Sequence, residues 1–188
     1  MGGKAAMKGW TEEEWTDKRL MAPCGPYCGT RGVYIATRDG NTKFRDILAK
    51  LYGSKPADTV CKGRMQEDPP ECLYSYCRSC RIRECVRKRG FYSCHQCSDF
   101  PCSYVTRFPL SVDRKVMRWA IPRWRELVSD HGDEEGRVRW AQSECERYHC
   151  SGCGHPLFRG ATAARAVSER WRLSCTGRRG TSRRSCSC

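Results

Sequence analysis

Residues 77–102 read CRSCRIRECVRKRGFYSCHQCSDFPC, and the cysteines in this stretch form a repeat. The unit CxxCxxxxC occurs twice, seventeen residues apart, at Cys77, Cys80 and Cys85 and again at Cys94, Cys97 and Cys102. Two residues between thiolates let both sulfurs of a pair reach one tetrahedral ion, and paired CxxC units build Zn(Cys)4 sites. The two CxxC pairs therefore predict zinc binding, and the third cysteine of each unit suits a second ion. The spacing leaves open which cysteines share an ion.

Hydrophobic burial alone is a weak source of stability around this repeat. Residues 61–102 contain eight cysteines, while their large aliphatic or Phe side chains are Met65, Leu73, Ile82, Val86, Phe91 and Phe100. A segment so poor in apolar side chains needs something to link its thiols. Disulfides and metal both fit the even total of sixteen cysteines in 188 residues.

The expected compartment favours metal over disulfides. The first twenty residues lack the hydrophobic run of a secretory signal, and no later stretch is long enough to span a bilayer. We therefore expect a cytoplasmic protein, whose thiols are kept reduced. Zinc is the predicted cofactor, and the alternative is an iron–sulfur or thiol redox protein. The cysteine spacings match neither common ferredoxin run, and no βαβ pattern supports a thioredoxin-like site.

Other cysteines extend the predicted set of metal ligands. Cys150-x-x-Cys153 is followed by Gly154 and His155 and has the form of the first knuckle of a zinc ribbon. A second knuckle is missing, so the sequence predicts a partial ribbon. The full set of predicted ligands is Cys24, Cys28, Cys61, Cys77, Cys80, Cys85, Cys94, Cys97, Cys102, Cys150 and Cys153.

The formal charge of +14 suggests nucleic-acid binding, but much of it is local. Residues 159–188 hold eight arginines and one glutamate, so half of the excess lies there. Each zinc tetrathiolate would add roughly −2 to the body of the protein. A further basic cluster runs from Arg78 to Arg89 and is expected to offset neighbouring thiolates or, alternatively, to contact phosphate. We expect an unknown protein or nucleic acid as partner, with any nucleic-acid binding non-specific and through the tail, and no membrane contact.

Hydrophobic periodicity and helix-capping residues predict the helices of the rest of the chain. Residues 42–52 predict a helix capped by Asn41 or Thr42, and Thr11 with Glu14 forms a capping box. Beyond residue 108 the helical period returns, with a new helix expected at Pro122 and another capped by Asp133. The predicted divisions are an N-terminal extension (1–20), a cysteine-rich metal-binding core (21–108), a helical pair (109–149), a partial zinc-ribbon knuckle (150–158) and a basic, disordered tail (159–188). The predicted fold class is small α+β and loop-rich, with a metal-stapled cysteine core, a C-terminal helical pair and a partial zinc ribbon.

Several motifs in fixed order resemble a known family. CGPYCGTRGVYIAT at 24–37, CRSCRIREC at 77–85 and CHQCSDFPC at 94–102 are similar to the domain of unknown function 3795, with likeness extending over about residues 21–155. The resemblance implies a cysteine-rich, zinc-binding bacterial or archaeal protein without an assigned activity. The family pattern reads Cys-Gly-x-Cys and Cys-x-Gly-Cys where this chain ends the motifs with Arg31 and Arg64. An arginine cannot ligate a cation, so both departures fall on the site that would use Cys24, Cys28 and Cys61.

The predicted function is that of a zinc-binding protein of uncharacterised role, whose structural metal ions support a scaffold for protein or nucleic-acid interaction. No Ser/His/Asp set, paired-carboxylate site or phosphate-cradling glycine loop stands out, and four histidines are few for an open zinc site. We therefore expect a binding module rather than an enzyme.

Overall fold

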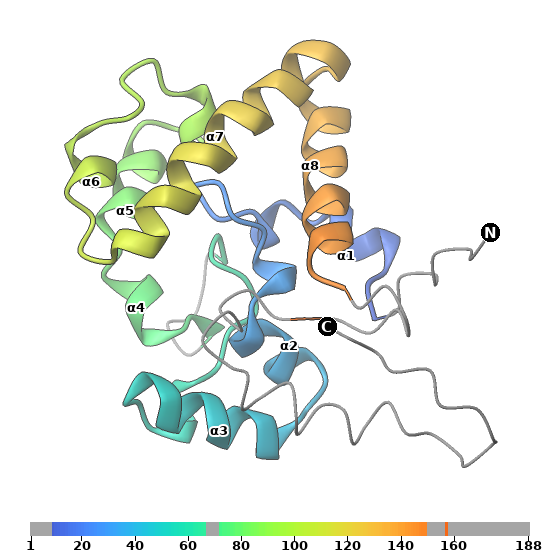
Figure 1. Ribbon diagram of the computed structural model, residues 1–188, viewed down its shortest axis with the longest axis vertical. Helices are drawn as coiled ribbons and strands as arrows, with labels where there is room; N and C mark the ends of the chain where they lie inside the picture. The colour runs from blue at the N-terminus through green and yellow to red at the C-terminus, as the bar shows by residue number, and fades with distance from the viewer. Residues whose placement is uncertain (1–8, 67–71, 150–156, 158–188) are drawn as a thin grey trace.

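The computed structural model describes residues 9–66, 72–149 and 157, and the part of the chain that it describes is mainly helical (Figure 1). The α-helices are α1 (Glu12–Thr16), α2 (Gly32–Arg38), α3 (Thr42–Tyr52), α4 (Ser75–Arg78), α5 (Arg81–Lys88), α6 (Ser103–Thr106), α7 (Ser111–His131) and α8 (Asp133–Arg147). Short 3-10 turns lie between them: η1 (Lys18–Leu20), η2 (Cys28–Thr30), η3 (Pro56–Asp58) and η5 (Cys94–Gln96). The predicted knuckle and basic tail lie outside the described residues.

The α+β fold class was wrong. No sheet forms within the described residues, where an isolated antiparallel bridge between Met21 and Tyr27 closes a turn. The short apolar run from Val33 to Ala36 lies in α2 and is buried at every position. A short run that is apolar on all sides fits a fully buried helix as well as a strand, and its surroundings decide between the two. The zinc ribbon has no support among the described residues.

The predicted helix starts at Thr11 and Asn41 are both confirmed. Thr11 and Glu14 form the predicted capping box at the start of α1. Asn41 accepts a hydrogen bond from the backbone N–H of Phe44, and α3 ends at Gly53. The buried face of α3 is narrower than its hydrophobic pattern suggested, because Leu51 remains 55% exposed.

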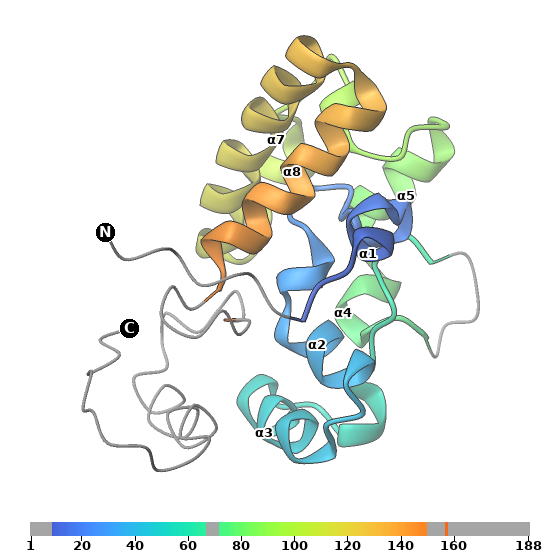
Figure 2. The same cartoon turned by 90° about the vertical axis from the view of Figure 1, so that its right-hand side faces the viewer.

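Helices α7 and α8 form a hairpin that covers one side of the molecule (Figures 1 and 2). The prediction that a new helix begins at Pro122 was wrong, because α7 passes through this residue. Proline inside a helix costs about 3 kcal/mol. The buried side chains of Ile121 and Trp124 on either side offset that cost by packing into the core. The cap of α8 is Gly132, and Asp133 is the first helical residue.

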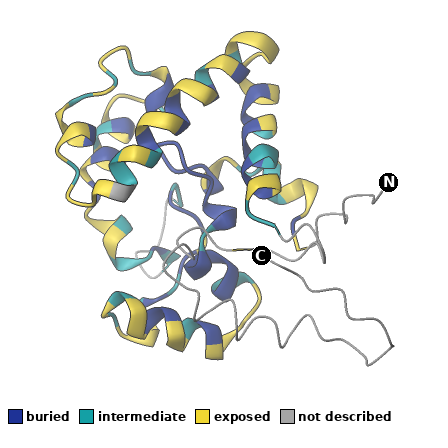
Figure 3. Ribbon diagram, in the orientation of Figure 1, coloured by how far each residue is buried: buried dark blue, intermediate teal, exposed yellow. Residues whose placement is uncertain are grey.

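An irregular segment from Leu20 to Thr30 runs through the centre of the molecule, where Figure 3 shows a buried stretch between the helices. Leu20, Met21 and Tyr27 are at most 1% exposed. Residues that precede this segment pack onto it as well, since the indole Nε1 of Trp10 donates a hydrogen bond of 3.1 Å to the carbonyl oxygen of Gly29. The central segment therefore connects the cysteine-rich side with the α7–α8 hairpin.

None of the helices in the described part of the chain is both long enough and apolar enough to cross a bilayer.

Candidate metal centre

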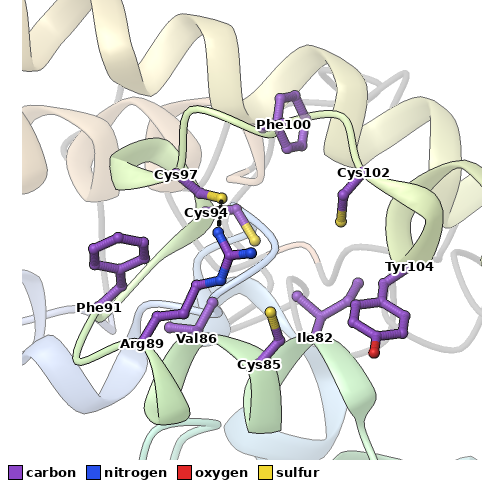
Figure 4. A pocket seen from close by; sticks show the side chains of 10 residues that line it. All are labelled: Ile82, Cys85, Val86, Arg89, Phe91, Cys94, Cys97, Phe100, Cys102 and Tyr104. Carbon is purple, nitrogen blue, oxygen red and sulfur yellow. Dashed lines mark hydrogen bonds between the residues drawn. The ribbon is translucent and has the colours of Figure 1, made fainter.

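Four cysteines of the repeat region line one pocket between α5, η5 and α6. Cys85 lies on α5, Cys94 begins η5, Cys97 follows η5, and Cys102 precedes α6. Figure 4 shows their four sulfur atoms turned toward the same space. None of these thiols is in a disulfide. The structure thus groups the second CxxC pair with the third cysteine of each repeat unit.

The turn that carries Cys94 and Cys97 is held from three directions. Within the turn, Ser93 and Gln96 form a capping box. From the central segment, the carbonyl oxygen of Pro23 accepts hydrogen bonds from the backbone N–H of Cys94 at 2.8 Å and from the Ser93 hydroxyl at 3.2 Å. These bonds fix the backbone that positions the two sulfurs.

The third anchor comes from α7. The guanidinium of Arg125 donates to the carbonyl oxygens of His95, at 2.9 Å from Nε, and of Cys97. On the other side of the turn, the ring of His95 lies 3.1 Å from an oxygen of Asp133, at the start of α8. Sequence patterns gave no signal for these contacts, because Arg125 and Asp133 are separated from the turn by about thirty residues or more.

The pocket walls are apolar. Ile82 and Val86 of α5 are 3% and 2% exposed, and Phe91 and Phe100 complete the lining. Burial raises the pKa of the Cys94 thiol, and the proximity of other thiols raises it further. A cation bound among the sulfurs would reverse this preference, because a coordinated thiol is deprotonated.

The donor set of this pocket fits zinc, although its geometry is open. Four sulfur donors match a structural tetrahedral site. Among residues 9–66, 72–149 and 157, however, no three Cys, His, Asp or Glu side chains stand close enough to hold one ion. The sulfurs would therefore have to move inward to bind one ion.

An arginine lies at the mouth of the same pocket. Nη1 of Arg89 donates to the sulfur of Cys97 at 3.2 Å and to the carboxylate of Asp99 at 2.8 Å. Its side chain is 46% exposed, so it can turn toward solvent without leaving a cavity in the core. Arg89 is therefore able to act as an outer hydrogen-bond donor to a ligand sulfur.

The other predicted ligands of the core lie in a second group around a buried arginine. Nη1 and Nη2 of Arg64 donate to the sulfurs of Cys24 and Cys80 at 3.3 and 3.2 Å. Burial alone would lower the pKa of Arg64, but the neighbouring thiols raise it overall. The thiols in this group are Cys24, Cys28, Cys61, Cys77 and Cys80.

Burial dominates the electrostatics of this second group. It raises the pKa values of the Cys24, Cys28 and Cys61 thiols. Arg31 and Arg64 oppose the increase at Cys24 and Cys28. Arg31 and Arg64, the two departures from the expected family pattern, thus both lie near this group, and the ligand pattern gave no signal for the contacts of Arg64 with the sulfurs.

The comparisons place the cysteine-rich region in a family. Residues 20–107 match the family described as "Protein of unknown function (DUF3795)". This region is a DUF3795 domain. The DUF3795 match contains both cysteine groups and ends before α7, whereas the resemblance had been expected to reach about residue 155. No curated protein and no solved structure matches the chain.

The match does not extend to every predicted ligand. Cys150 and Cys153 lie beyond the DUF3795 region and outside the described residues, so their coordination stays a prediction.

Proposed function

We propose that this protein binds a structural zinc ion through Cys85, Cys94, Cys97 and Cys102, and that the site supports a scaffold for binding a nucleic acid. The observation that carries the proposal is the convergence of four thiols from three separate elements on one pocket (Figure 4). Four protein sulfurs complete a tetrahedral zinc site, which leaves no position for a reacting water. The site therefore favours a structural role over catalysis.

The position of the pocket indicates what zinc would stabilise. α5 contributes only Ile82 and Val86 as buried side chains, and α6 contributes only Val105. Such short helices are marginal without tertiary support. Cys85 on α5 and Cys102 beside α6 would tie both helices to the anchored turn at Cys94, so metal binding would add directly to the folding free energy.

The exposed surface of α5 is the candidate site for nucleic-acid binding. Lys88 pairs with Glu84 at 2.7 Å, and the guanidinium of Arg83 donates to the backbone carbonyl of Arg64 at 2.8 Å. The side chains of Arg81 and Arg87 are exposed and make no hydrogen bond or ion pair within the described residues. The basic cluster is thus divided in its roles, because Arg89 contacts a sulfur while Arg81 and Arg87 face solvent.

A pocket at this surface supports contact with phosphate. Its lining includes Arg78, Arg81, Arg83 and Arg87. The pKa of Arg83 is lowered, first by burial and then by the nearby charge of Arg87, and Glu84 is the acidic residue of the same lining. Phosphate groups bind such clusters through charge-assisted hydrogen bonds. Binding of this kind is steeply dependent on salt and insensitive to sequence.

Metal content tests the first part of the proposal. Full-length protein purified without oxygen is analysed for zinc and iron and by absorption spectroscopy, beside Cys94→Ser and the control Cys72→Ser, whose thiol lies outside the pocket lining. We expect colourless zinc protein, loss of one zinc ion from Cys94→Ser and no loss from Cys72→Ser. Iron with charge-transfer absorption would establish the iron–sulfur alternative and contradict the zinc assignment.

Charge reversal tests the second part. Arg81→Glu/Arg87→Glu changes the surface of α5, while Arg118→Glu/Arg123→Glu makes the same change in net charge on exposed positions of α7. We expect the α5 variant to bind single-stranded DNA and RNA at least about 10-fold more weakly at low salt, with a reduced salt slope. An equal loss in both variants would show that binding follows net charge or the Arg-rich tail.

A further inference from the structure

The guanidinium of Arg64 lies among the sulfurs of the second cysteine group, in a position where a metal ion could otherwise bind. Its side chain is buried, with 8% of the residue exposed. Its two terminal nitrogens bond to Cys24 from the central segment and Cys80 at the start of α5, at 3.3 and 3.2 Å. One guanidinium therefore connects three segments of the chain, as a bound metal ion would.

The backbone fixes Arg64 in this inward position. The preceding residue, Gly63, has φ +124°, and a Cβ there would lie 2.6 Å from the carbonyl oxygen of Arg19. The following residue, Met65, donates its backbone N–H to that same carbonyl at 3.0 Å. The carbonyl of Arg64 accepts the hydrogen bond from Arg83. The loop is thus held on both sides of the arginine.

A metal ion and this guanidinium exclude each other. Arginine stays protonated in proteins and offers only donors, so it cannot ligate a cation. A second cation among the same sulfurs would be repelled strongly in a medium of low dielectric constant. Arg89 at the other pocket differs, because its half-exposed side chain can move into solvent. Arg64 has no comparable path, since its burial and its fixed loop keep it inside.

We infer that the guanidinium of Arg64 is the permanent cation of the second cysteine group, so that Cys24, Cys28, Cys61, Cys77 and Cys80 bind no metal ion in this chain. The group is then a hydrogen-bonded arginine–sulfur cluster that links the central segment, the loop at Cys61 and the start of α5. This inference corrects the ligand set predicted from cysteine spacing. It adds to the proposed zinc site at Cys94 and remains distinct from it.

The first experiment compares zinc content in single variants of the full-length protein. Cys24→Ser removes one hydrogen-bond acceptor of Arg64, and Cys94→Ser removes a ligand of the proposed zinc site. We expect Cys24→Ser to retain the zinc content of the wild type and Cys94→Ser to lose one ion. Loss of one ion from Cys24→Ser would overturn the inference. Unchanged zinc in Cys94→Ser would instead overturn the proposed function, so the two failures are distinguishable.

The second experiment replaces the arginine itself. Arg64→Cys creates a CxxC pair with Cys61, whose spacing suits one tetrahedral ion. Arg64→Ser serves as the matched control, because serine is similar in size to cysteine but is a poor zinc ligand. We expect Arg64→Cys to bind one more zinc ion than Arg64→Ser by native mass spectrometry, and Arg64→Ser to match the wild type. Additional zinc in Arg64→Ser as well would show that removing the guanidinium is sufficient to admit an ion, which also supports the inference. No additional zinc in Arg64→Cys relative to the wild type would overturn it.

Discussion

The indole Nε1 of Trp140 donates a hydrogen bond of 2.8 Å to the carbonyl oxygen of Gly25. This contact joins α8 to the residue after Cys24, across 115 positions of sequence. Trp140 is completely buried, so water cannot replace the lost donor. We expect Trp140→Phe to lower the free energy of unfolding by about 1–3 kcal/mol, as measured by urea denaturation.

Trp119→Phe provides the control for that prediction. Trp119 stacks obliquely on Trp140 but is 39% exposed. We expect its replacement to change stability by no more than about 0.5 kcal/mol. Equal losses in the two variants would show that ring volume, and not the bond to Gly25, accounts for the effect.

Both the backbone conformation and the close packing at position 25 require glycine. Its φ is +107°, and an added Cβ would lie 2.8 Å from the Cβ of Ala120 on α7. We expect Gly25→Ala to destabilise the fold by roughly 2–5 kcal/mol, from strain in the backbone and overpacking together. The comparison is Gly40→Ala, where φ is +59° and no atom lies within 4 Å, and where about 1–2 kcal/mol is expected. Similar thermal midpoints for the two variants would argue against close packing at Gly25.

Arg125 positions the turn of the candidate zinc site without belonging to it. Its side chain donates to the carbonyl oxygens of His95 and Cys97. If these residues hold zinc as proposed, Arg125→Ala should weaken zinc affinity about 10- to 100-fold, because the sulfurs lose their fixed orientation. Arg123→Ala is the control, since Arg123 pairs with Glu126 on the same helix. Competition with a chromophoric chelator measures the zinc affinity of each variant. Equal zinc affinities in Arg125→Ala and Arg123→Ala would refute the positioning role of Arg125.

The buried thiol of Cys145 makes the stability of the fold dependent on pH in the alkaline range. Burial raises the pKa of its thiol to about 12, although a hydrogen bond from Trp15 opposes the shift. Because the folded state holds this proton more tightly than the unfolded state does, the stabilising contribution is complete below about pH 9 and declines as pH rises toward 12. We expect the unfolding free energy of the wild type to fall relative to Cys145→Ala by up to about 1.4 kcal/mol per pH unit in that range.

The control for this pH dependence is Cys72→Ala, because Cys72 is only partly buried. The difference between this variant and the wild type should change little over the same pH range. A constant difference for Cys145→Ala as well would contradict the assigned burial of that thiol.

Short-range signals in the sequence were sufficient for several elements. The capping box of Thr11 with Glu14 and the helix after Asn41 were predicted correctly, since a helix start is decided by residues three or four positions apart. The cysteine motifs also identified the DUF3795 family. Spacing reflects which sulfurs can lie near each other along one turn, and this is a local property of the chain.

The partners of those cysteines depended on tertiary structure. Cys94 and Cys97 share a pocket with Cys85 and Cys102, while Cys80 faces Arg64, and the same CxxC spacing is compatible with either arrangement. The path of α7 through Pro122 and the helical state of Val33 to Ala36 were likewise decided by burial against distant segments. In each case the deciding free energy comes from contacts between residues far apart in sequence, which no local pattern records.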